Sequence, residues 1–589
     1  MERGSLIRWL LIGVAVFLFI QYGWPAISGQ PNGGGEGGET QLQPLAGIID
    51  NTAPPESERS GELTCNLQGN RFRAQLTTKG AALKHLWMEG EKYTRAVDGK
   101  KEPIDLVTTW VQARMPLRTD LREPTGAAQQ LAYNDFDWKL GLMTAKSCRF
   151  TYEDDKVKLE KTISATDGPF ELEVTLSVKN KAAETQRHRL AIEQTDWRTK
   201  NETSGGFMQR APEFMTRVET RAGDNTERLD PSDFAPGEFS GEGFTSEMWR
   251  RIPGDPAWTA VANSYFAKAV IPIKGPEKPA AEVLVEEVWD HGKFPNKDND
   301  PNYGHVYRAR LNYPIQTLAK GQTATYEVLA YVGPKERAVL GAVGGTGHEV
   351  IELLDLGWFG WIGRILIHYL YLLYGLVGTW GVAICLLTIT VKILLFPLSI
   401  TQIKSTMAMR KLKPEMDEIN KKYKDDATQK GLAMQELWRK NKVTNPMLGC
   451  LPVLLQMPVW FALYQALQTA VELYHTPFGP LIPDLSAPDG LYIIPVLLGA
   501  SSFLQQHLMP MQGDAMQQKM MKYMMPGMFT VMMLFLPAGL GIYFLTNTWL
   551  SILQQVAVER YYKSREDPGG GGSKTNPKDG ADKAKPKAA

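Results

Sequence analysis

Hydrophobic and polar residues alternate along the first half of the chain as they do in β-strands. Phe170, Leu172, Val174, Leu176 and Val178 are separated by single residues that are mostly polar, which gives one apolar and one polar face. Further strands are expected at 189–193, 281–288, 305–313 and 326–332, with turn signals such as Thr166-Asp-Gly-Pro between strands. This pattern predicts an exported antiparallel β-sandwich domain over 61–336.

From about residue 350 the alternation gives way to long apolar runs. A membrane-spanning helix needs about 20 apolar residues, and five such helices are expected. Their predicted ranges are 379–398, 446–470, 491–509, 523–536 and 539–557. The helix at 523–536 is either short or begins before Tyr523, and a tight Leu536-Pro-Ala-Gly-Leu hairpin joins it to the last one.

Two further segments are expected to associate with the membrane. Apolar residues at spacings of three and four over 348–374 are interrupted by charges, which favours an amphipathic helix lying in the interface; an ordinary helix packed on the sandwich fits the same pattern. Residues 1–24 place Arg3 and Arg8 before an apolar core. This segment fits an anchor helix, which would be the sixth span, and it also fits a cleaved signal peptide. Either one would export the domain after residue 24.

The distribution of basic residues predicts the orientation of these helices. Segment 399–444 holds eleven Lys and Arg against six acidic residues, whereas the loop 471–490 holds no Lys or Arg. Positive charge concentrates on the cytoplasmic side, so 399–444 and both termini are expected there. The Gly- and Pro-rich segment 25–60 is expected to be a flexible linker on the outer side.

The cytoplasmic parts suggest contacts with other molecules. Segment 399–444 is expected to form a helical hairpin that turns at Lys424-Asp-Asp, with stripes containing Met416 and Met434. Exposed methionines would suit varied apolar clients, although a self-contained charged hairpin is the alternative. The basic tail 563–589 is expected to be disordered; it would touch ribosomal RNA or lipid head groups, or serve only solubility.

Composition excludes several classes of function. The net charge of +1 and the apolar runs exclude a wholly soluble protein and a basic DNA-binding protein, and the four cysteines form no CxxC pair. No phosphate loop, HExxH motif or Ser/His/Asp spacing is present, so we expect no enzyme, no metal site and no cofactor. Cys65 and Cys148 would share an oxidising compartment, but the sequence leaves their pairing open.

Lys392 is the one formally charged residue well inside any of the last five predicted spans. A cation there costs about 2.5–3.5 kcal/mol on insertion scales, so it needs a wet cavity, a partner or a route to the interface. Snorkelling toward Pro397 is one solution. Thr388, one turn away, and polar residues in the other spans favour a hydrated cationic groove instead.

Ion-coupled transport requires features that these spans lack. They contain no Asp or Glu, with Glu472 only at an end, and coupled transporters generally use such carboxylates or unwound ion sites. A small-solute transporter is therefore the second hypothesis. A glycan-binding module on a membrane anchor is a third, and it leaves five spans unexplained.

Three segments carry a resemblance to a known family. They are Asn445-Pro-Met-Leu-Gly-Cys-Leu-Pro-Val-Leu-Leu-Gln-Met-Pro-Val-Trp-Phe-Ala-Leu-Tyr464, Met525-Pro-Gly-Met-Phe-Thr530 and Phe535-Leu-Pro-Ala-Gly-Leu-Gly-Ile-Tyr-Phe544. They resemble the YidC-type membrane protein insertases over about 350–562. The anchor and exported domain resemble the Gram-negative branch in architecture only.

The resemblance implies a five-helix core with a hydrophilic groove for client segments. Lys392 stands where the family has an arginine, Thr388, Gln456 and Tyr543 match groove-lining positions, and Phe535 stands where an aromatic residue is usual. Lysine keeps the charge but loses the planar fork that grips a carboxylate through two hydrogen bonds. The exported domain would resemble a sugar-mutarotase-like supersandwich.

The implied function is insertion and folding of membrane proteins, alone or beside the Sec translocon. The implied partners are nascent inner-membrane proteins, the Sec translocon, the lipid bilayer and, through the hairpin and basic tail, the ribosome. The implied location is the bacterial inner membrane, with residues 25–350 in the periplasm.

This topology predicts opposite exposures for two positions. A single cysteine at Lys421 faces the cytoplasm and one at Asp484 faces the periplasm, because of the asymmetry in basic residues. On a cysteine-free background in intact spheroplasts, an impermeant thiol reagent is expected to label position 484 and to leave position 421 unlabelled until the cells are lysed. Labelling at 421 alone would contradict the topology.

Overall fold

A computed structural model describes most of the exported domain and most of the helical half of the chain. The described residues are 45–46, 61–97, 100–110, 114–122, 138–203, 214–234, 246–247, 249–289, 293–345, 348–357, 359–423, 426–441, 451–508 and 519–566. The predicted anchor at 1–24, most of the linker at 25–60, residues 446–450 and the tail beyond 566 lie outside them. Contacts divide the chain into two units: residues 1–387, 456–498 and 527–544 form the first, and the rest form the second.

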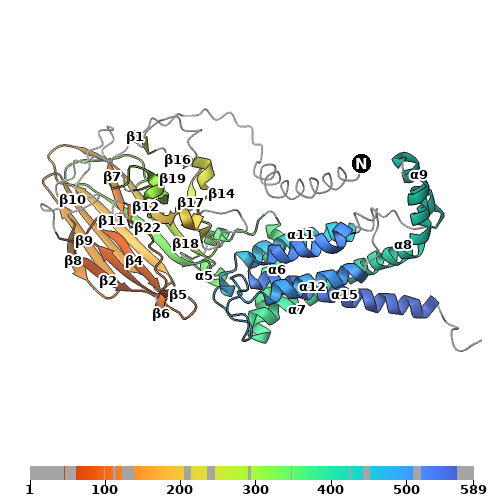
Figure 1. The fold of residues 1–589 in the computed structure, drawn as a ribbon. Coiled ribbons are helices and arrows are strands. Elements are labelled where there is room, and N and C mark those ends of the chain that lie inside the picture. Colours follow the sequence, from red (N-terminus) through yellow and green to blue (C-terminus); the bar gives the residue numbers. More distant parts are fainter. Residues whose placement is uncertain are drawn as a thin grey trace, which may run out of the picture. The chain divides into compact units, whose positions relative to one another are not determined.

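The larger sheet of the first unit contains nine antiparallel strands (Figure 1). In spatial order these are β14 (Asn225–Leu229), β13 (Arg217–Ala222), β17 (Pro256–Ala262), β18 (Phe266–Lys274), β22 (Thr323–Pro334), β11 (Glu171–Asn180), β10 (Val157–Ala165), β9 (Ser147–Glu153) and β8 (Lys139–Met143). The alternation at 170–178 appears in β11, where Leu172, Val174, Leu176 and Val178 are buried. The seven C-terminal residues of β22 are all buried, as its two apolar faces predict.

The second sheet packs on the first. Its order is β16 (Arg250–Ile252), β19 (Ala280–Val288), β20 (Gly304–Asn312), β12 (Gln186–Thr199) and β21 (Gln316–Leu318), and β7 (Thr119–Arg122) also pairs with β12. β17 and β18 lie against β12 and β20, which creates the core between the layers. The predicted strands at 189–193, 281–288 and 305–313 are thus confirmed as β12, β19 and β20, and the domain is antiparallel as expected.

Smaller elements complete the exported domain. The remaining strands are β1 (Leu45–Ala46), β2 (Thr64–Gln68), β3 (Phe72–Thr77), β4 (Ala82–Met88), β5 (Thr94–Val97), β6 (Lys100–Pro103) and β15 (Ser246–Glu247). The short helices are α4 (Lys200–Thr203), η5 (Pro231–Phe234), η6 (Lys297–Asn299), α5 (Arg337–Leu340) and η7 (Val350–Leu353). β2, β3 and β4 form one sheet, β5 pairs with β6, and β1 pairs with β15.

The predicted amphipathic helix over 348–374 is wrong in its first half. Only η7 is helical before α6, which runs from Gly360 to Val377. Gly357 adopts a φ of 64°, which a helix cannot accommodate, and Asp355 forms an ion pair of 3.0 Å with Arg217 of β13. The charge that was expected on the polar face of a helix instead fixes a non-helical connection to the sandwich.

α6 itself is apolar on both sides. Leu366, Ile367, Leu370 and Leu373 are buried, whereas Trp361, Ile365, Leu372 and Leu376 are among the exposed large hydrophobic residues. Its length and composition allow it to cross a membrane, alone among the single helices of the described residues. Its interfacial placement stays a prediction.

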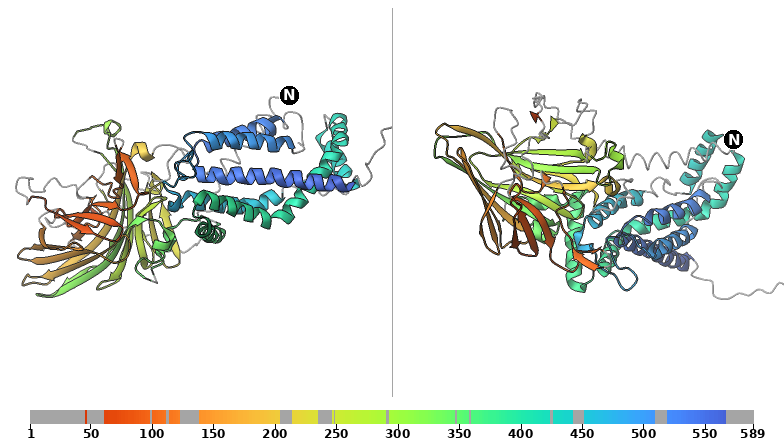
Figure 2. Two further views of the ribbon diagram at one scale, coloured as in Figure 1. Left: turned by 90° about the horizontal axis from the view of Figure 1, so that it is seen from below. Right: turned by 60° about the vertical axis from the view of Figure 1, so that its left-hand side comes forward.

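The other apolar segments form helices near the predicted ranges (Figure 2). They are α7 (Trp380–Leu394), α11 (Leu451–Gln468), α12 (Ile493–Leu508), the π-helical turn η9 (Met520–Met524), α14 (Met525–Met533) and α15 (Ala538–Glu566), with the turn η8 (Val471–Leu473) following α11. The helix predicted at 523–536 thus begins before Tyr523, which was one of its two predicted alternatives. The count of six spans stays a prediction.

α7 leads into the hairpin through a sharp bend. α8 (Phe396–Lys422) begins beside Pro397, and its first turns make an angle of 62° with α7. Proline lacks the N–H that would continue the preceding helix, and it is tolerated in a first turn. One long apolar run is therefore divided between a helix with membrane-spanning character and the start of the hairpin.

The hairpin packs its apolar side chains against each other. α8 and α9 (Ala427–Lys440) enclose Leu412, Met416, Met434 and Leu437, each at most 9% exposed. The expectation of exposed methionines is therefore wrong for Met416 and Met434, because each stripe finds its partner on the facing helix. The self-contained hairpin describes these residues better.

A disulfide joins Cys65 of β2 to Cys148 of β9, 83 residues apart. Both cysteines are at most 2% exposed. The bond connects the three-stranded sheet to the nine-stranded one. It shows that the two cysteines, whose pairing the sequence left open, are paired.

Replacing Cys65 and Cys148 with alanine is expected to lower the free energy of unfolding of the sandwich by about 3–5 kcal/mol, because the open loop regains entropy in the unfolded chain. Urea unfolding of the purified full chain, followed by tryptophan fluorescence, measures the change. Cys385→Ala, at a cysteine of α7 that forms no disulfide, is the matched control. Equal unfolding midpoints for the double variant and the control would contradict a stabilising disulfide.

Candidate functional site

The predicted groove residues Thr388 and Lys392 lie one turn apart on α7, in the second unit. Thr388 is 1% exposed and Lys392 is 7% exposed. The helix forms because the run Trp380–Leu394 is apolar and contains no proline. It therefore holds a lysine in a largely apolar environment, where an ammonium group requires a partner.

That partner is a serine on α15. The Lys392 Nζ donates to Ser551 Oγ at 2.8 Å, and the Ser551 hydroxyl donates in turn to the Asn547 carbonyl at 2.8 Å. The Gln554 side chain donates to the backbone carbonyl of Lys392 at 3.5 Å. The ammonium group is hydrogen-bonded, but no carboxylate among the described residues forms an ion pair with it. None of the described residues therefore neutralises its positive charge.

The other three predicted residues belong to the first unit. Tyr543 of α15 is 2% exposed, and Phe535, in the turn before α15, is 45% exposed. Gln456 lies in α11, and its side chain is outside the described residues. The structure thus brings Thr388 and Lys392 together on one helix, and the groove formed by all five residues stays a prediction.

The sequence analysis missed a polar cluster in which side chains from within α8 and α15 meet the C-terminal end of α12. Arg410 of α8 forms an ion pair of 3.0 Å with Glu559 of α15 and donates to the carbonyl of Leu508 at the end of α12. Gln555 donates to the same carbonyl at 2.9 Å. These donors satisfy a terminal carbonyl that a helix end leaves unpaired. No spacing in the sequence indicates this cluster, because its contacts between helices join residues about 50 to 150 positions apart.

The sandwich contacts the membrane-associated helices through a half-buried carboxylate. Glu472 in η8 accepts a hydrogen bond from the Tyr371 hydroxyl of α6 and one of 3.3 Å from the Arg337 backbone N–H. Burial raises the pKa of Glu472 above its usual value. The adjacent Tyr474 contacts the ring of Phe266 in β18, with 5.5 Å between the ring centroids.

A second carboxylate at this contact is paired instead. Glu336 accepts two hydrogen bonds of 2.8 Å from Arg71 and a third from the Tyr93 hydroxyl, and Lys92 lies 3.4 Å away. Burial acts to raise the pKa of Glu336, but these partners outweigh it and lower the pKa to about 2. Near neutral pH, Glu336 is therefore an ionised, fixed element of the contact.

No group of three His, Cys, Asp or Glu residues in the described part of the chain is arranged to hold a metal ion. The polar groups named above hold helices and sheets together or surround Lys392.

The sequence matches two protein families. The YidC periplasmic domain family covers residues 64–369, and the 60Kd inner membrane protein family covers residues 372–566. The membrane protein insertase YidC of Anaeromyxobacter sp. strain Fw109-5 is 33% identical over 499 residues, or 84% of each chain.

Two solved structures are more distantly similar. A crystal structure of an active YidC insertase covers 85% of this chain and 93% of its own, at 19% identity and a TM-score of 0.34. A galactose mutarotase-like protein from Lactobacillus casei ATCC 334 covers 46% of this chain and 100% of its own, at 12% identity and a TM-score of 0.28. TM-scores this low decide nothing about the fold, so the mutarotase-like supersandwich stays a prediction.

Glu336→Gln is expected to destabilise the sandwich by about 1–3 kcal/mol at pH 7, because it removes the charge that pairs with Arg71. The depressed pKa means that this contribution is present above about pH 4.5 and is lost as the pH falls toward 2. The difference in unfolding free energy between wild type and variant, measured from pH 7 to pH 3, should therefore shrink. Glu89→Gln, at an exposed carboxylate, is the control, and a pH-independent difference would show that the ion pair contributes nothing.

Proposed function

The chain belongs to the YidC-type membrane protein insertases, and from that premise we propose that it receives the polar segment of a nascent inner-membrane protein beside Lys392 and releases the apolar helix sideways into lipid. Membership in the family makes it an inner-membrane protein with a periplasmic domain. A small-solute transporter is not favoured, since the relatives share the insertase name.

The observation that carries the proposal is the un-neutralised charge of Lys392. Its ammonium group is 2.8 Å from a neutral serine hydroxyl and forms no ion pair among the described residues. A positive charge with low-dielectric surroundings attracts an acidic segment more strongly than the same charge in water. A permanent carboxylate partner would cancel this attraction.

The bond to Ser551 also bears on the snorkelling alternative. A snorkelling lysine extends its amine to the water at the end of the helix. Here the amine is bound to the side chain of a residue in the interior of α15, and Lys392 is 7% exposed. This supports an interior position for the charge, as a groove lined by Thr388, Gln456, Phe535 and Tyr543 would require.

Insertion in this scheme needs no chemical step. The client gains about 25 cal/mol for each Å² of apolar surface that leaves water, and this gain drives its helix into lipid. The attraction to Lys392 offsets part of the cost of desolvating the polar segment and so lowers the barrier. We therefore propose an insertase and chaperone that is not an enzyme and that works alone or with the Sec translocon. The ribosome is the proposed partner of the cytoplasmic hairpin and tail.

Substitutions at Lys392 are expected to separate clients by the charge of their polar segments. Lys392→Arg should retain insertion, Lys392→Ala should be intermediate, and Lys392→Glu should reduce insertion of acidic-tailed clients about tenfold or more. Clients with neutral tails should be spared. Insertion into proteoliposomes that contain only this protein, at equal amounts of folded variant, provides the measurement.

A second variant moves the positive charge from position 392 to position 551. Thr388 is almost fully buried, whereas Ser551 already faces the amine, so Lys392→Ala combined with Ser551→Lys should recover part of the insertion of acidic-tailed clients. Lys421→Glu, at an exposed hairpin lysine, controls for a change in net charge. Equal insertion of acidic-tailed clients by wild type and Lys392→Glu would eliminate charge capture.

A further inference from the structure

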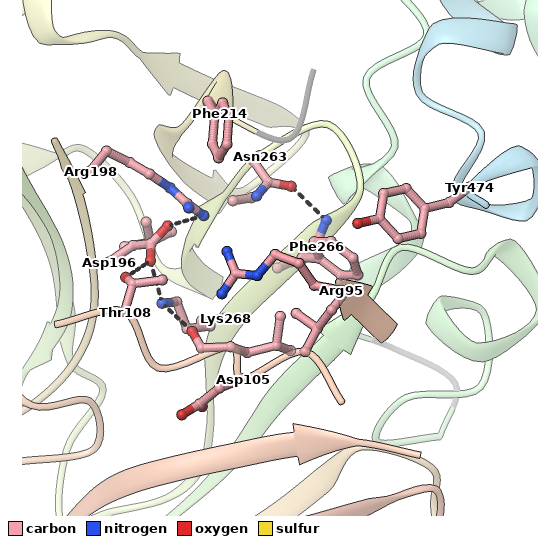
Figure 3. Close-up of a pocket in the computed structure, with 15 residues that line it drawn as sticks. Arg95, Asp105, Thr108, Asp196, Arg198, Phe214, Asn263, Phe266, Lys268 and Tyr474 are labelled. Carbon is pink, nitrogen blue, oxygen red and sulfur yellow. Dashed lines mark hydrogen bonds and ion pairs between the residues drawn. The ribbon is translucent and has the colours of Figure 1, made fainter. Parts of the chain in front are cut away.

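The exported domain contains a cavity that insertion does not use. Its volume is about 70 Å³, and it lies where β12, the β17–β18 turn, β5 and residues 104–108 meet Tyr474 (Figure 3). A space of this size holds more than a single water molecule, and because the lining residue Arg95 is exposed it opens to the surface, so it suits a carboxylate and the adjoining part of a small ring.

The floor of the cavity carries more positive than negative charge. Asp196 of β12 is bound by Lys268 at 2.7 Å and by Arg198 at 3.0 Å, so one carboxylate faces two cations. Asp105 is engaged with His85 at 2.6 Å. Arg95 adds a third cation, which leaves the ionised lining groups with a net charge of one positive when His85 is neutral.

Two lining residues have side-chain donors that no described residue uses. Arg95 is exposed, and its side chain forms no hydrogen bond or ion pair with any described residue. The side-chain oxygen of Asn263 accepts from the backbone N–H groups of Tyr265 and Phe266 at 2.9 and 2.7 Å. This fixes the orientation of the amide and leaves its nitrogen free to donate. Figure 3 shows the Arg95 guanidinium lying among Asp196, Lys268, Asn263 and Phe266.

The walls are aromatic. Phe214, Phe266 and Tyr474 line the cavity together with Val261 and Ala262. The guanidinium of Arg198 lies over the Phe214 ring at 5.7 Å. A ligand in this place would contact flat apolar surfaces on its sides and charged donors at its base, which is the usual composition of small-molecule sites.

We propose that this cavity binds a small organic monocarboxylate, whose carboxylate is held by Arg95 and the Asn263 amide and whose carbon skeleton contacts Phe266 and Tyr474. A planar guanidinium with free N–H groups matches a carboxylate geometrically. The net charge of one positive suits a monoanion, whereas Asp105 and Asp196 disfavour a dianion such as phosphate. A neutral sugar would leave the excess charge uncompensated.

This site lies outside the Lys392 region and does not depend on the insertion mechanism. Tyr474 belongs to the same loop as Glu472, which Tyr371 of α6 contacts. An occupied cavity would therefore stabilise a loop that joins the exported domain to a membrane-associated helix.

Benzoate is a suitable probe because it combines a planar carboxylate with an apolar ring, and benzamide is its neutral isostere. Binding to the full chain in lipid nanodiscs is measured by saturation-transfer NMR, with empty nanodiscs correcting for partition into lipid. Benzoate is expected to bind at least about tenfold tighter than benzamide. Arg95→Ala should weaken benzoate binding by about tenfold and Arg95→Lys by less.

Arg251→Ala removes an exposed arginine elsewhere in the same domain and should leave benzoate binding unchanged. Inorganic phosphate and glucose should not displace benzoate. Absence of benzoate binding up to about 10 mM, equal binding of benzamide, or undiminished binding by Arg95→Ala would overturn the proposal. Displacement by phosphate or by glucose would overturn the assignment to a monocarboxylate.

Discussion

The membrane-associated half of this protein is built around the cost of holding an ammonium group inside an apolar helix. Among the described residues, Lys392 meets that cost with a hydrogen bond to Ser551 and not with an ion pair. A carboxylate would stabilise the lysine further, but it would also remove the electric field that we propose attracts a client. The serine satisfies the donor and preserves the charge.

Near the contact between the sandwich and the adjacent helices, buried charges are instead neutralised by ion pairs. Arg71 and Glu336 form a two-point ion pair, and Arg217 pairs with Asp355, whose pKa its arginine neighbours lower to about 2 despite burial. Such neutralised pairs fix positions without attracting further charge. These paired charges therefore contrast with Lys392, which forms no ion pair with a described residue.

Patterns that depend on local sequence were predicted well. The alternation at 170–178 defined β11, and apolar length placed α7, α12 and α15 within a few residues at the starts of the helices. Predictions that depended on partners distant in sequence were less successful. The helix expected to begin at 348 was wrong, because Asp355 pairs with Arg217 in a non-helical segment. Met416 and Met434 were expected to be exposed on the hairpin, but they are buried where α8 and α9 face each other. No sequence pattern predicted the roles of Ser551, Glu472 or the residues that line the cavity. These residues are scattered along the chain, and only the fold brings them next to their partners.

The choice of lysine at position 392 follows from the acceptors around it. A guanidinium presents five donors in a fixed plane, and a buried one needs several acceptors to satisfy them. Ser551 offers a single hydroxyl oxygen, and that hydroxyl already donates its proton to Asn547, so its lone pairs face the amine. An ammonium group can use one acceptor here and direct its remaining N–H groups elsewhere. A lysine at position 392 and a serine on the facing helix thus form one consistent arrangement, in which the charge is kept and fewer donors are buried than an arginine would bring.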